Sequence, residues 1–160
     1  IARNQLARLN ENNKNRNYNL VYLSTGLEEL GIYTFLPPEH IQRVYFEYLV
    51  CPNFDVIGIP INLFIEALKA EGCLAALPRY PLLHQQPFFS EGAFLDVMRP
   101  KDSASVPDYS AVSLPVTERV NGTMMKLPAF PWASKELLDQ YLIAFKKVIG
   151  HADRIVKHTN

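Results

Sequence analysis

The chain begins with a regular spacing of apolar positions that is typical of an α-helix. Gly31 ends this pattern, and six asparagines between positions 10 and 19, which are weak helix formers, interrupt its middle. The pattern therefore predicts a long bridging helix over residues 1–31 that is packed at both ends and more hydrated between them; an exposed, partly frayed segment is the alternative. The positions that share one stripe of the helix are Ala2, Leu6, Leu9, Asn13, Arg16, Leu20, Leu23, Leu27 and Leu30.

The next third of the chain alternates between strand-like and helix-like patterns. Ile41–Val50 is rich in β-branched and aromatic residues, which predicts a strand. A short helix follows, with Asn62 as its N-cap and Gly72 as its stop. Cys73–Tyr80 has the pattern of a second, shorter strand. This βαβ-like alternation indicates an α/β or α+β fold.

The last part of the chain contains one irregular stretch and one clear helix. Residues 81–116 show no period and carry five prolines, which predicts a long loop of the kind that is often functional. Leu114–Met125 can form a short helix, and Lys126–Phe130 a short extended segment. Ser134 is a good N-cap for a closing amphipathic helix. Its predicted buried face consists of Leu138, Tyr141, Phe145, Val148 or Ile149, and Ala152.

Composition narrows the possible functions. The chain has 160 residues, enough for one domain with its own core. Sixteen basic residues balance sixteen acidic ones, so no net charge favours nucleic acid or an anionic membrane as a partner. No apolar run reaches the roughly 20 residues that span a bilayer. Cys51 and Cys73 are too far apart for a zinc knuckle, so we expect no metal site. Because no signal peptide is recognisable at the start, we expect two free thiols in a reducing cytoplasm.

The one candidate for binding chemistry is the loop YPLLHQQPFF, residues Tyr80–Phe89. There are no phosphate-binding, zinc-protease or nucleophile-elbow motifs in the chain. His84 lies between prolines and aromatic residues, with Arg79, Tyr80 and Gln86 close in sequence, and a histidine can exchange hydrogen bonds with a hydroxylated ligand. A structural loop with its histidine bonded to backbone fits equally well. His40, His151 and His158 are expected on the surface.

The order of these segments resembles the carboxy-terminal part of DegT-type sugar aminotransferases, which are pyridoxal-phosphate enzymes of the aspartate aminotransferase fold type. The strongest pieces are the H-x-Q-P core of the loop at residues 84–87 and a downstream P-x-x-E at residues 115–118, followed by L-P and S. The segments that carry the resemblance across nearly the whole chain are NRNYNLVYLSTGLEELGI, RVYFEYLV, INLFIEALKAEG, RYPLLHQQPFF, LPVTERV, MKLPAFP and SKELLDQYLIAFKKVI.

This resemblance implies a particular fold and domain organisation. It implies an α+β small domain: a small, mostly antiparallel sheet with helices packed on one face, a long N-terminal helix and a C-terminal amphipathic helix. Residues 1–31 would bridge from a large amino-terminal domain, and residues 32–160 would form the small domain. Because the chain begins at Ile1 and not at Met, we expect that large domain to precede it.

The resemblance also implies where the cofactor is held. In the family, the lysine that forms the Schiff base belongs to the large domain, in a serine-containing stretch followed by glycines. Lys135 follows Ser134 but begins a capped helix with no glycine-rich continuation. We therefore expect no catalytic residue in this chain, weak binding of pyridoxal phosphate to it, and no transamination by it alone.

The substrate-binding residues implied by the motif are His84 and Gln86. Tyr80 and Arg79 are added because they are neighbours in sequence, and Arg43 is a further candidate cation for a carboxylate or phosphate. The complete enzyme, expected to be a homodimer, would transfer an amino group from glutamate or glutamine to a keto-sugar, often nucleotide-linked, or to a keto-cyclitol. Residues 90–113 match no family pattern, and acceptor specificity can lie there.

Two other interpretations fit the same sequence. An independent α+β binding or interaction module would also lack a catalytic lysine. A family member that has lost its chemistry and serves as a sensor or regulator is the third possibility. The sequence upstream of Ile1 distinguishes the three, because the enzyme needs a large domain with a lysine near glycines.

Overall fold

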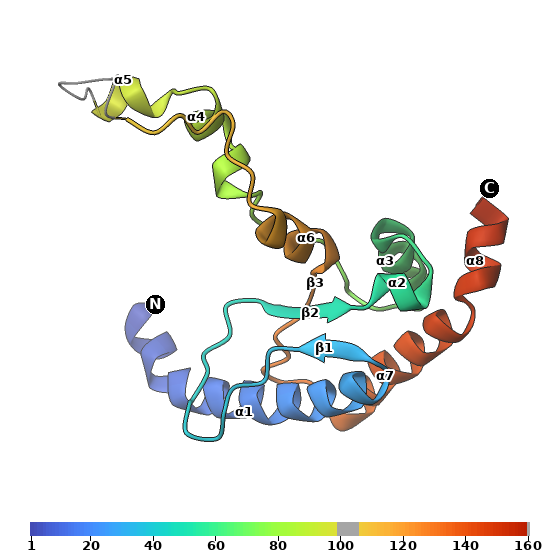
Figure 1. Ribbon diagram of the computed structural model, residues 1–160. Helices are drawn as coiled ribbons and strands as arrows, with labels where there is room; N and C mark the ends of the chain where they lie inside the picture. The colour runs from blue at the N-terminus through green and yellow to red at the C-terminus, as the bar shows by residue number, and fades with distance from the viewer. Residues whose placement is uncertain (99–105, 160) are drawn as a thin grey trace. The chain divides into compact units, whose positions relative to one another are not determined.

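Helices and one short antiparallel sheet make up the chain, which is described by a computed structural model covering residues 1–98 and 106–159 (Figure 1). The fold is α+β, as the sequence predicts. Contacts within the chain define two compact units. The first, here called the sheet unit, contains Ile1–Leu77 and the residues from Thr123 onward; the second, here called the loop unit, is Pro78–Gly122.

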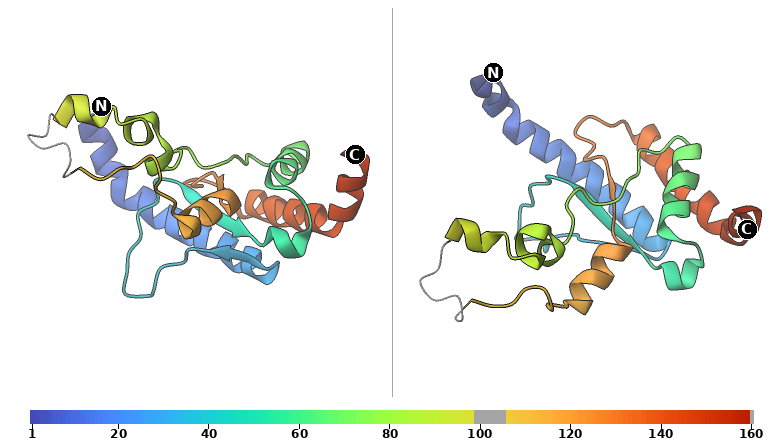
Figure 2. Two further views of the ribbon diagram at one scale, coloured as in Figure 1. Left: turned by 45° about the horizontal axis from the view of Figure 1, so that its top comes forward. Right: turned by 90° about the horizontal axis from the view of Figure 1, so that it is seen from above.

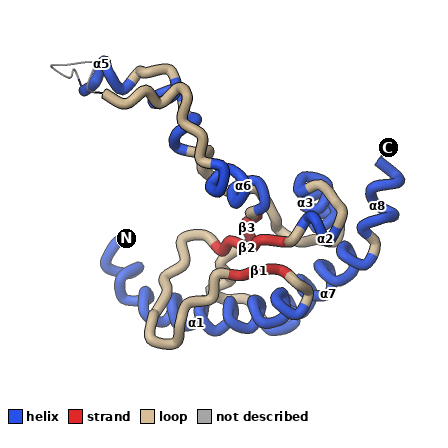
Figure 3. Tube along the Cα trace, viewed as in Figure 1, coloured by secondary structure: helices blue, strands red, loops and turns tan. Residues whose placement is uncertain are grey.

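Two long helices, several shorter helices and three very short strands are the regular elements of the described residues (Figure 3). Those of the sheet unit are α1 (Ala2–Glu29), β1 (Ile32–Thr34), β2 (Tyr48–Pro52), α2 (Phe54–Ile57), α3 (Ile61–Ala70), β3 (Met125–Leu127), α7 (Lys135–Gly150) and α8 (Ala152–Thr159). Those of the loop unit are the 3₁₀ turn η1 (Leu83–Gln85), α4 (Pro87–Ser90), α5 (Phe94–Met98) and α6 (Pro115–Thr123), which ends at the boundary of the two units.

The sheet has the strand order β1-β2-β3, and both strand pairs are antiparallel. Val50 in the central strand pairs with Thr34 on one side and with Met125 on the other. Along β2, Tyr48, Val50 and Pro52 are buried, whereas the two residues between them are only half-buried. This period of two gives the sheet one core face. α1 and α7 run side by side beneath the sheet (Figures 1 and 2).

The first helix confirms the predicted boundaries, because α1 ends at Glu29 and Gly31 adopts a left-handed φ of 77° just after it. Its packing differs from the prediction, since the first eleven residues are exposed, including Leu6 and Leu9. Leu20, Leu23 and Leu27 are completely buried. Each such leucine contributes about 1.5–3 kcal/mol by leaving water, so the C-terminal half of the helix is the part that anchors it.

The asparagine-rich middle of α1 is more buried than its composition suggests. Asn13 and Asn19 are buried. The Asn17 amide donates to the carbonyl of Arg43 at 3.0 Å, and the Asn19 amide donates to the carbonyl of Phe130 at 2.7 Å. These side chains therefore satisfy carbonyl groups of loops that cross the helix, a role for which an amide is suited and leucine is not.

One of those loops contains a strained residue. Phe130 has a φ of 44°, which is unusual for a residue with a side chain and costs roughly 1–2 kcal/mol. Its ring is buried and stacks edge-on against Tyr141, with the ring centroids 4.9 Å apart. The hydrogen bond from Asn19 to its carbonyl and this ring contact together offset the cost of the backbone conformation.

The closing helix has the predicted cap and the predicted buried face. The hydroxyl of Ser134 accepts a hydrogen bond from the backbone of Leu137, and Leu138, Tyr141, Phe145 and Val148 are buried. Phe145 meets Phe64 of α3 with 5.8 Å between ring centroids. The core of the sheet unit thus joins residues of α1, α3, α7 and the sheet in one cluster.

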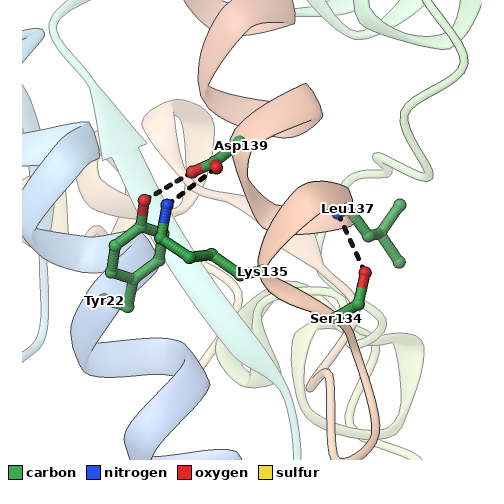
Figure 4. A network of polar contacts seen from close by, with 5 residues as sticks. All are labelled: Tyr22, Ser134, Lys135, Leu137 and Asp139. Atoms are coloured by element: carbon green, nitrogen blue, oxygen red, sulfur yellow. Dashed lines mark hydrogen bonds and ion pairs between the residues drawn. The ribbon is translucent and has the colours of Figure 1, made fainter.

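A polar cluster also links α1 to α7 (Figure 4). The hydroxyl of Tyr22 and the ammonium of Lys135 both donate to the carboxylate of Asp139, the second at 2.9 Å. The hydrogen bond from Tyr22, and next the one from Lys135, hold the pKa of Asp139 below its usual value. Lys135 also lies over the ring of Tyr22. This lysine, the one that follows a serine in sequence, is therefore a structural contact between two helices.

The strand predicted at Ile41–Val50 is wrong over most of its length, because β2 begins only at Tyr48. The preceding residues form an irregular segment that crosses α1. There the carbonyl of Arg43 bonds to Asn17 of the helix, and the guanidinium of Arg43 donates to the carbonyl of Phe35. At these two carbonyls the partner is a side chain and not a neighbouring strand.

Four further predictions about local structure are corrected. α3 begins at Ile61 after Pro60, so Asn62 lies inside the first turn and is not the cap. Cys73–Tyr80 is not a strand: Ala76 alone forms a bridge, with Lys126. Residues 81–116 contain the short helical segments η1, α4 and α5. The βαβ-like alternation is not realised either, since both strand pairs are antiparallel.

Outside residues 81–116, three short elements were not predicted: β1, α2 and α8. Each has eight residues or fewer, too few for a periodic pattern to stand out. The predicted short helix at Leu114–Met125 and the extended segment at Lys126–Phe130 correspond to α6 and β3. Within the described residues, none of the helices combines the length and the apolar character needed to cross a membrane.

The core of the sheet unit is tested most directly on α7. We expect Phe145→Ala to lower the free energy of unfolding by about 3–5 kcal/mol, because the ring is fully buried and its removal leaves a cavity. Ile143→Ala on the same helix changes a side chain that is 65% exposed and is expected to cost less than about 0.5 kcal/mol. Urea unfolding followed by circular dichroism measures both; equal losses would show that α7 does not pack as described.

Candidate functional site

A histidine–glutamate pair lies in the loop unit. His84 Nε2 and Glu118 Oε1 are 3.0 Å apart, although the two residues are 34 positions apart in sequence. The imidazole side chain is 8% exposed and that of the glutamate is 33% exposed. This hydrogen bond therefore joins the H-x-Q-P and P-x-x-E segments, the two strongest motifs of the sequence, in one small site.

Prolines set the local backbone on the histidine side. His84 is the middle residue of the turn η1, whose flanking residue Leu82 is extended. Gln86 is extended too, and Pro87 then occupies the first turn of α4. Because proline fixes φ and lacks the N–H that a first turn leaves unpaired, the H-x-Q-P order ends one turn and starts the next helix directly after the histidine.

Glu118 is oriented by the start of α6. The helix begins at Pro115, and Glu118 lies in its first turn. The Glu118 carboxylate accepts a hydrogen bond from the backbone N–H of Leu114 at 2.8 Å, while the Glu118 backbone N–H donates to the Leu114 carbonyl at 2.9 Å. The bond between the two backbone groups is the first i→i−4 bond of the helix, whereas the bond to the carboxylate satisfies an N–H before the helix start and fixes the direction of the carboxylate.

The electrostatics keep this carboxylate ionised. The backbone N–H of Leu114, and next the imidazole of His84, hold the pKa of Glu118 below its ordinary value of 4.5. An ionised carboxylate only accepts hydrogen bonds, so the nitrogen of His84 that faces it must be the donor.

The other predicted substrate-binding residues, Gln86, Arg79 and Tyr80, differ from His84 in burial and in their partners. Gln86 is half-buried, and its carbonyl accepts the backbone N–H groups of Phe89 and Ser90. Arg79 and Tyr80 are exposed, the tyrosine at 63%. The partner that the fold gives His84 is Glu118, not one of these three. Their roles in substrate binding stay predictions.

Arg43, the alternative cation, belongs to the sheet unit. Its guanidinium donates to the carbonyl of Phe35 and lies 4.6 Å from the ring centroid of Tyr45. Arg43 therefore stabilises the irregular segment before β2. In the same unit, the ammonium of Lys126 pairs with the carboxylate of Glu47 at 3.2 Å.

A cavity in the loop unit lies close to the aromatic residues that follow His84. It has a volume of about 350 Å³ and includes Phe89, Phe94 and Tyr109 in its lining, together with the acidic residues Glu91 and Asp108. The three rings contact one another at centroid distances of 5.3 to 6.1 Å. They form the apolar centre of this unit, and His84 is not among the residues that line the cavity.

The described lysines do not form a site for a Schiff base. Such a lysine is activated in a desolvated environment. Of the lysines in the described part of the chain, Lys126 is half-buried and the others are exposed, and Lys126, Lys135 and Lys147 are paired with carboxylates. Lys101 lies outside the described residues. The residues described here therefore do not fit pyridoxal phosphate by themselves. They also contain no group of three or more histidine, cysteine, aspartate or glutamate side chains arranged for a metal ion.

Glu118 was not predicted as part of the site. Two signals in the sequence pointed to it: an acidic residue in the first turn after a proline, and its place in one of the two strongest motifs. Nothing in a single sequence states that residues 84 and 118 meet. That contact depends on how the chain folds back over the intervening residues.

Comparison with known proteins gives consistent results. A sequence model of the DegT/DnrJ/EryC1/StrS aminotransferase family matches residues 1–142. A DegT DnrJ EryC1 StrS aminotransferase from Brucella abortus has a similar structure, with a TM-score of 0.65 and 19% identity over 92% of this chain and 34% of that protein. A protein described as a putative sugar aminotransferase from Streptococcus pneumoniae, in its PMP form, is also similar in structure. Its TM-score is 0.61, with 19% identity over 92% of this chain and 33% of that protein.

At this level of identity, the structural likeness shows a common fold. The chain spans about a third of the length of these two structures. A search of curated proteins finds no match.

The pH dependence of the site tests the contacts of Glu118. We expect its carboxyl to titrate below 4.5, because the ionised form accepts both hydrogen bonds. Its stabilising contribution is then complete above the ordinary pKa and is lost as the pH falls through the lower value of the folded chain. Carbon NMR of the carboxyl measures this midpoint, and the Leu114 amide shift should follow it in the native chain but not in Glu118→Gln. A midpoint at or above 4.5 would contradict the described geometry.

Proposed function

This chain belongs to the DegT/DnrJ/EryC1/StrS aminotransferase family, and from that membership we propose that it forms the small domain of a pyridoxal-phosphate-dependent sugar aminotransferase. The observation that carries the proposal is the family match over residues 1–142, which includes both members of the His84–Glu118 pair. The similarity in fold to an aminotransferase from Brucella abortus supports it.

The cofactor belongs, in this proposal, to another part of the enzyme. Members of the family are generally dependent on pyridoxal phosphate, and the similar protein from Streptococcus pneumoniae is in its PMP form, the aminated form of that coenzyme. Pyridoxal phosphate supplies the electron sink for transamination when it is bound. Because the lysines described here offer no site for it, a large domain must provide the Schiff-base lysine.

The two proposed parts of the chain would have different roles. Residues 1–31 would bridge to the large domain, and the exposure of Leu6 and Leu9 at the start of α1 is consistent with a partner surface there. Residues 32–160 would form the small domain that closes over the substrate. We propose a homodimer in the cytoplasm, a compartment that suits the free thiols of Cys51 and Cys73.

The substrate would be a keto-sugar, often nucleotide-linked, or a keto-cyclitol, with glutamate or glutamine as amino donor. His84 would contact a hydroxyl of the acceptor, since an imidazole nitrogen can exchange a hydrogen bond with it. Gln86 would assist. Arg79 could bind a carboxylate or phosphate through two parallel hydrogen bonds, and Tyr80 could cover the sugar ring. Residues 90–113, of which 99–105 lie outside the described residues, would contribute to the choice of acceptor.

The role of His84 is testable in the complete enzyme by separating the two half-reactions. We expect His84→Ala to lower kcat/KM for the sugar acceptor roughly tenfold or more, because a hydrogen bond in a water-poor site is lost, and to change the amino-donor half-reaction less than about twofold. His40→Ala, at an exposed histidine, is the control. Equal losses in both half-reactions would show that the loop supports the cofactor or the fold instead.

The proposed division of labour is tested with this chain alone. Mixed with pyridoxal phosphate and then reduced with borohydride, it should give no stoichiometric adduct at a single lysine, because its lysines are solvated or paired. Mass spectrometry of the digest measures the adducts, and the complete enzyme is the positive control. One fully modified lysine would show that the chain itself holds the coenzyme.

A further inference from the structure

The two nitrogens of the His84 imidazole are in different surroundings. Nε2 lies 3.0 Å from Glu118 Oε1, whereas Nδ1 has no hydrogen-bond partner among the residues that the structure describes. A neutral imidazole carries its proton on one nitrogen and offers a lone pair on the other. The group that bonds to Nε2 therefore decides whether Nδ1 offers a ligand a lone pair or a proton.

The carboxylate beside Nε2 has little freedom to turn. Glu118 Oε1 is the atom that bonds to the imidazole, and the same atom accepts the backbone N–H of Leu114 at 2.8 Å. The start of α6 thus fixes one oxygen in place, and that oxygen cannot donate a hydrogen bond while the carboxylate is ionised. On the side of the imidazole, the partner that this oxygen requires is therefore a protonated Nε2.

We propose that Glu118 is a positioning residue that holds the His84 proton on Nε2 and so presents Nδ1 as a hydrogen-bond acceptor for a hydroxyl of the sugar acceptor. The identity of the ligand rests on the proposed function, whereas the tautomer rests only on the contacts of His84 and Glu118. It assigns a direction to the substrate contact: the sugar hydroxyl donates and the imidazole accepts. A carboxylate partner of this kind is a general way to fix a histidine tautomer.

The competing explanation is that the His84–Glu118 bond only holds η1 and α6 together. Substitutions of Glu118 separate the two explanations, because the Leu114 N–H fixes which side-chain atom faces the imidazole. In Glu118→Gln, the side-chain oxygen must stay on the Leu114 N–H, because the amide nitrogen cannot accept from it. That oxygen then still accepts from Nε2. Glu118→Gln should therefore keep the tautomer although it removes the charge, whereas Glu118→Ala should lose it. Val116→Ala, at a position of α6 that is 64% exposed, controls for the stability of the helix.

The tautomer is measured by nitrogen–proton NMR of the protein with ¹⁵N-labelled histidine, with the signal of His84 assigned from the His84→Ala variant. At a pH where the imidazole is neutral, we expect the Nε2–H form in the native chain, in Glu118→Gln and in Val116→Ala, and a mixture of both forms in Glu118→Ala. An Nδ1–H form in the native chain overturns the inference, whatever reaction the enzyme catalyses.

Kinetics of the complete enzyme test the consequence. Glu118→Ala should raise KM for the sugar acceptor about tenfold, with a smaller effect on kcat, and Glu118→Gln should stay within about twofold of the native enzyme. Combining Glu118→Ala with His84→Ala should add nothing to His84→Ala alone, because Glu118 acts through the histidine. Additive losses overturn the positioning role. An unchanged KM in both single alanine variants, with the tautomer as expected, overturns instead the substrate contact of His84 on which the inference rests.

Discussion

The burial of one helix face against the sheet is the interaction on which the sheet unit depends. Leu20, Leu23 and Leu27 are inaccessible to water, and they belong to the same cluster as Val50 of the central strand and Phe145 of α7. Strands of three to five residues have too few ladder hydrogen bonds to be stable alone. The sheet therefore exists because two long helices cover one of its faces.

Polar groups then determine which loops lie against that core. Asn17 and Asn19 each bond to the carbonyl of a distant loop residue, and Ser24 exchanges a hydrogen bond with the buried hydroxyl of Tyr48 at 2.7 Å. Burial raises the pKa of that tyrosine, so its hydroxyl stays protonated in the folded chain. Burying these groups unpaired would cost more than their bonds contribute, which makes the arrangement selective.

The same principle operates in the loop unit on a smaller scale. Its apolar centre is a group of aromatic rings around Phe94, and its polar centre is the pair of His84 and Glu118. Pro87 and Pro115 each begin a short helix next to one member of the pair. A rigid backbone on both sides suits the substrate contact proposed for His84, because little ordering would be left to occur on binding.

The sequence by itself determined the two long helices, their stop and cap at Gly31 and Ser134, the fold class and the family, because helical periodicity and motif order are local signals. The tertiary structure decided the rest. The segment before Tyr48 has the composition of a strand, but its Arg43 carbonyl bonds to Asn17 of α1 and no strand forms there; no local pattern records that competition. Likewise, His84 and Glu118 were both visible in motifs, yet their contact across 34 positions exists only in the folded chain.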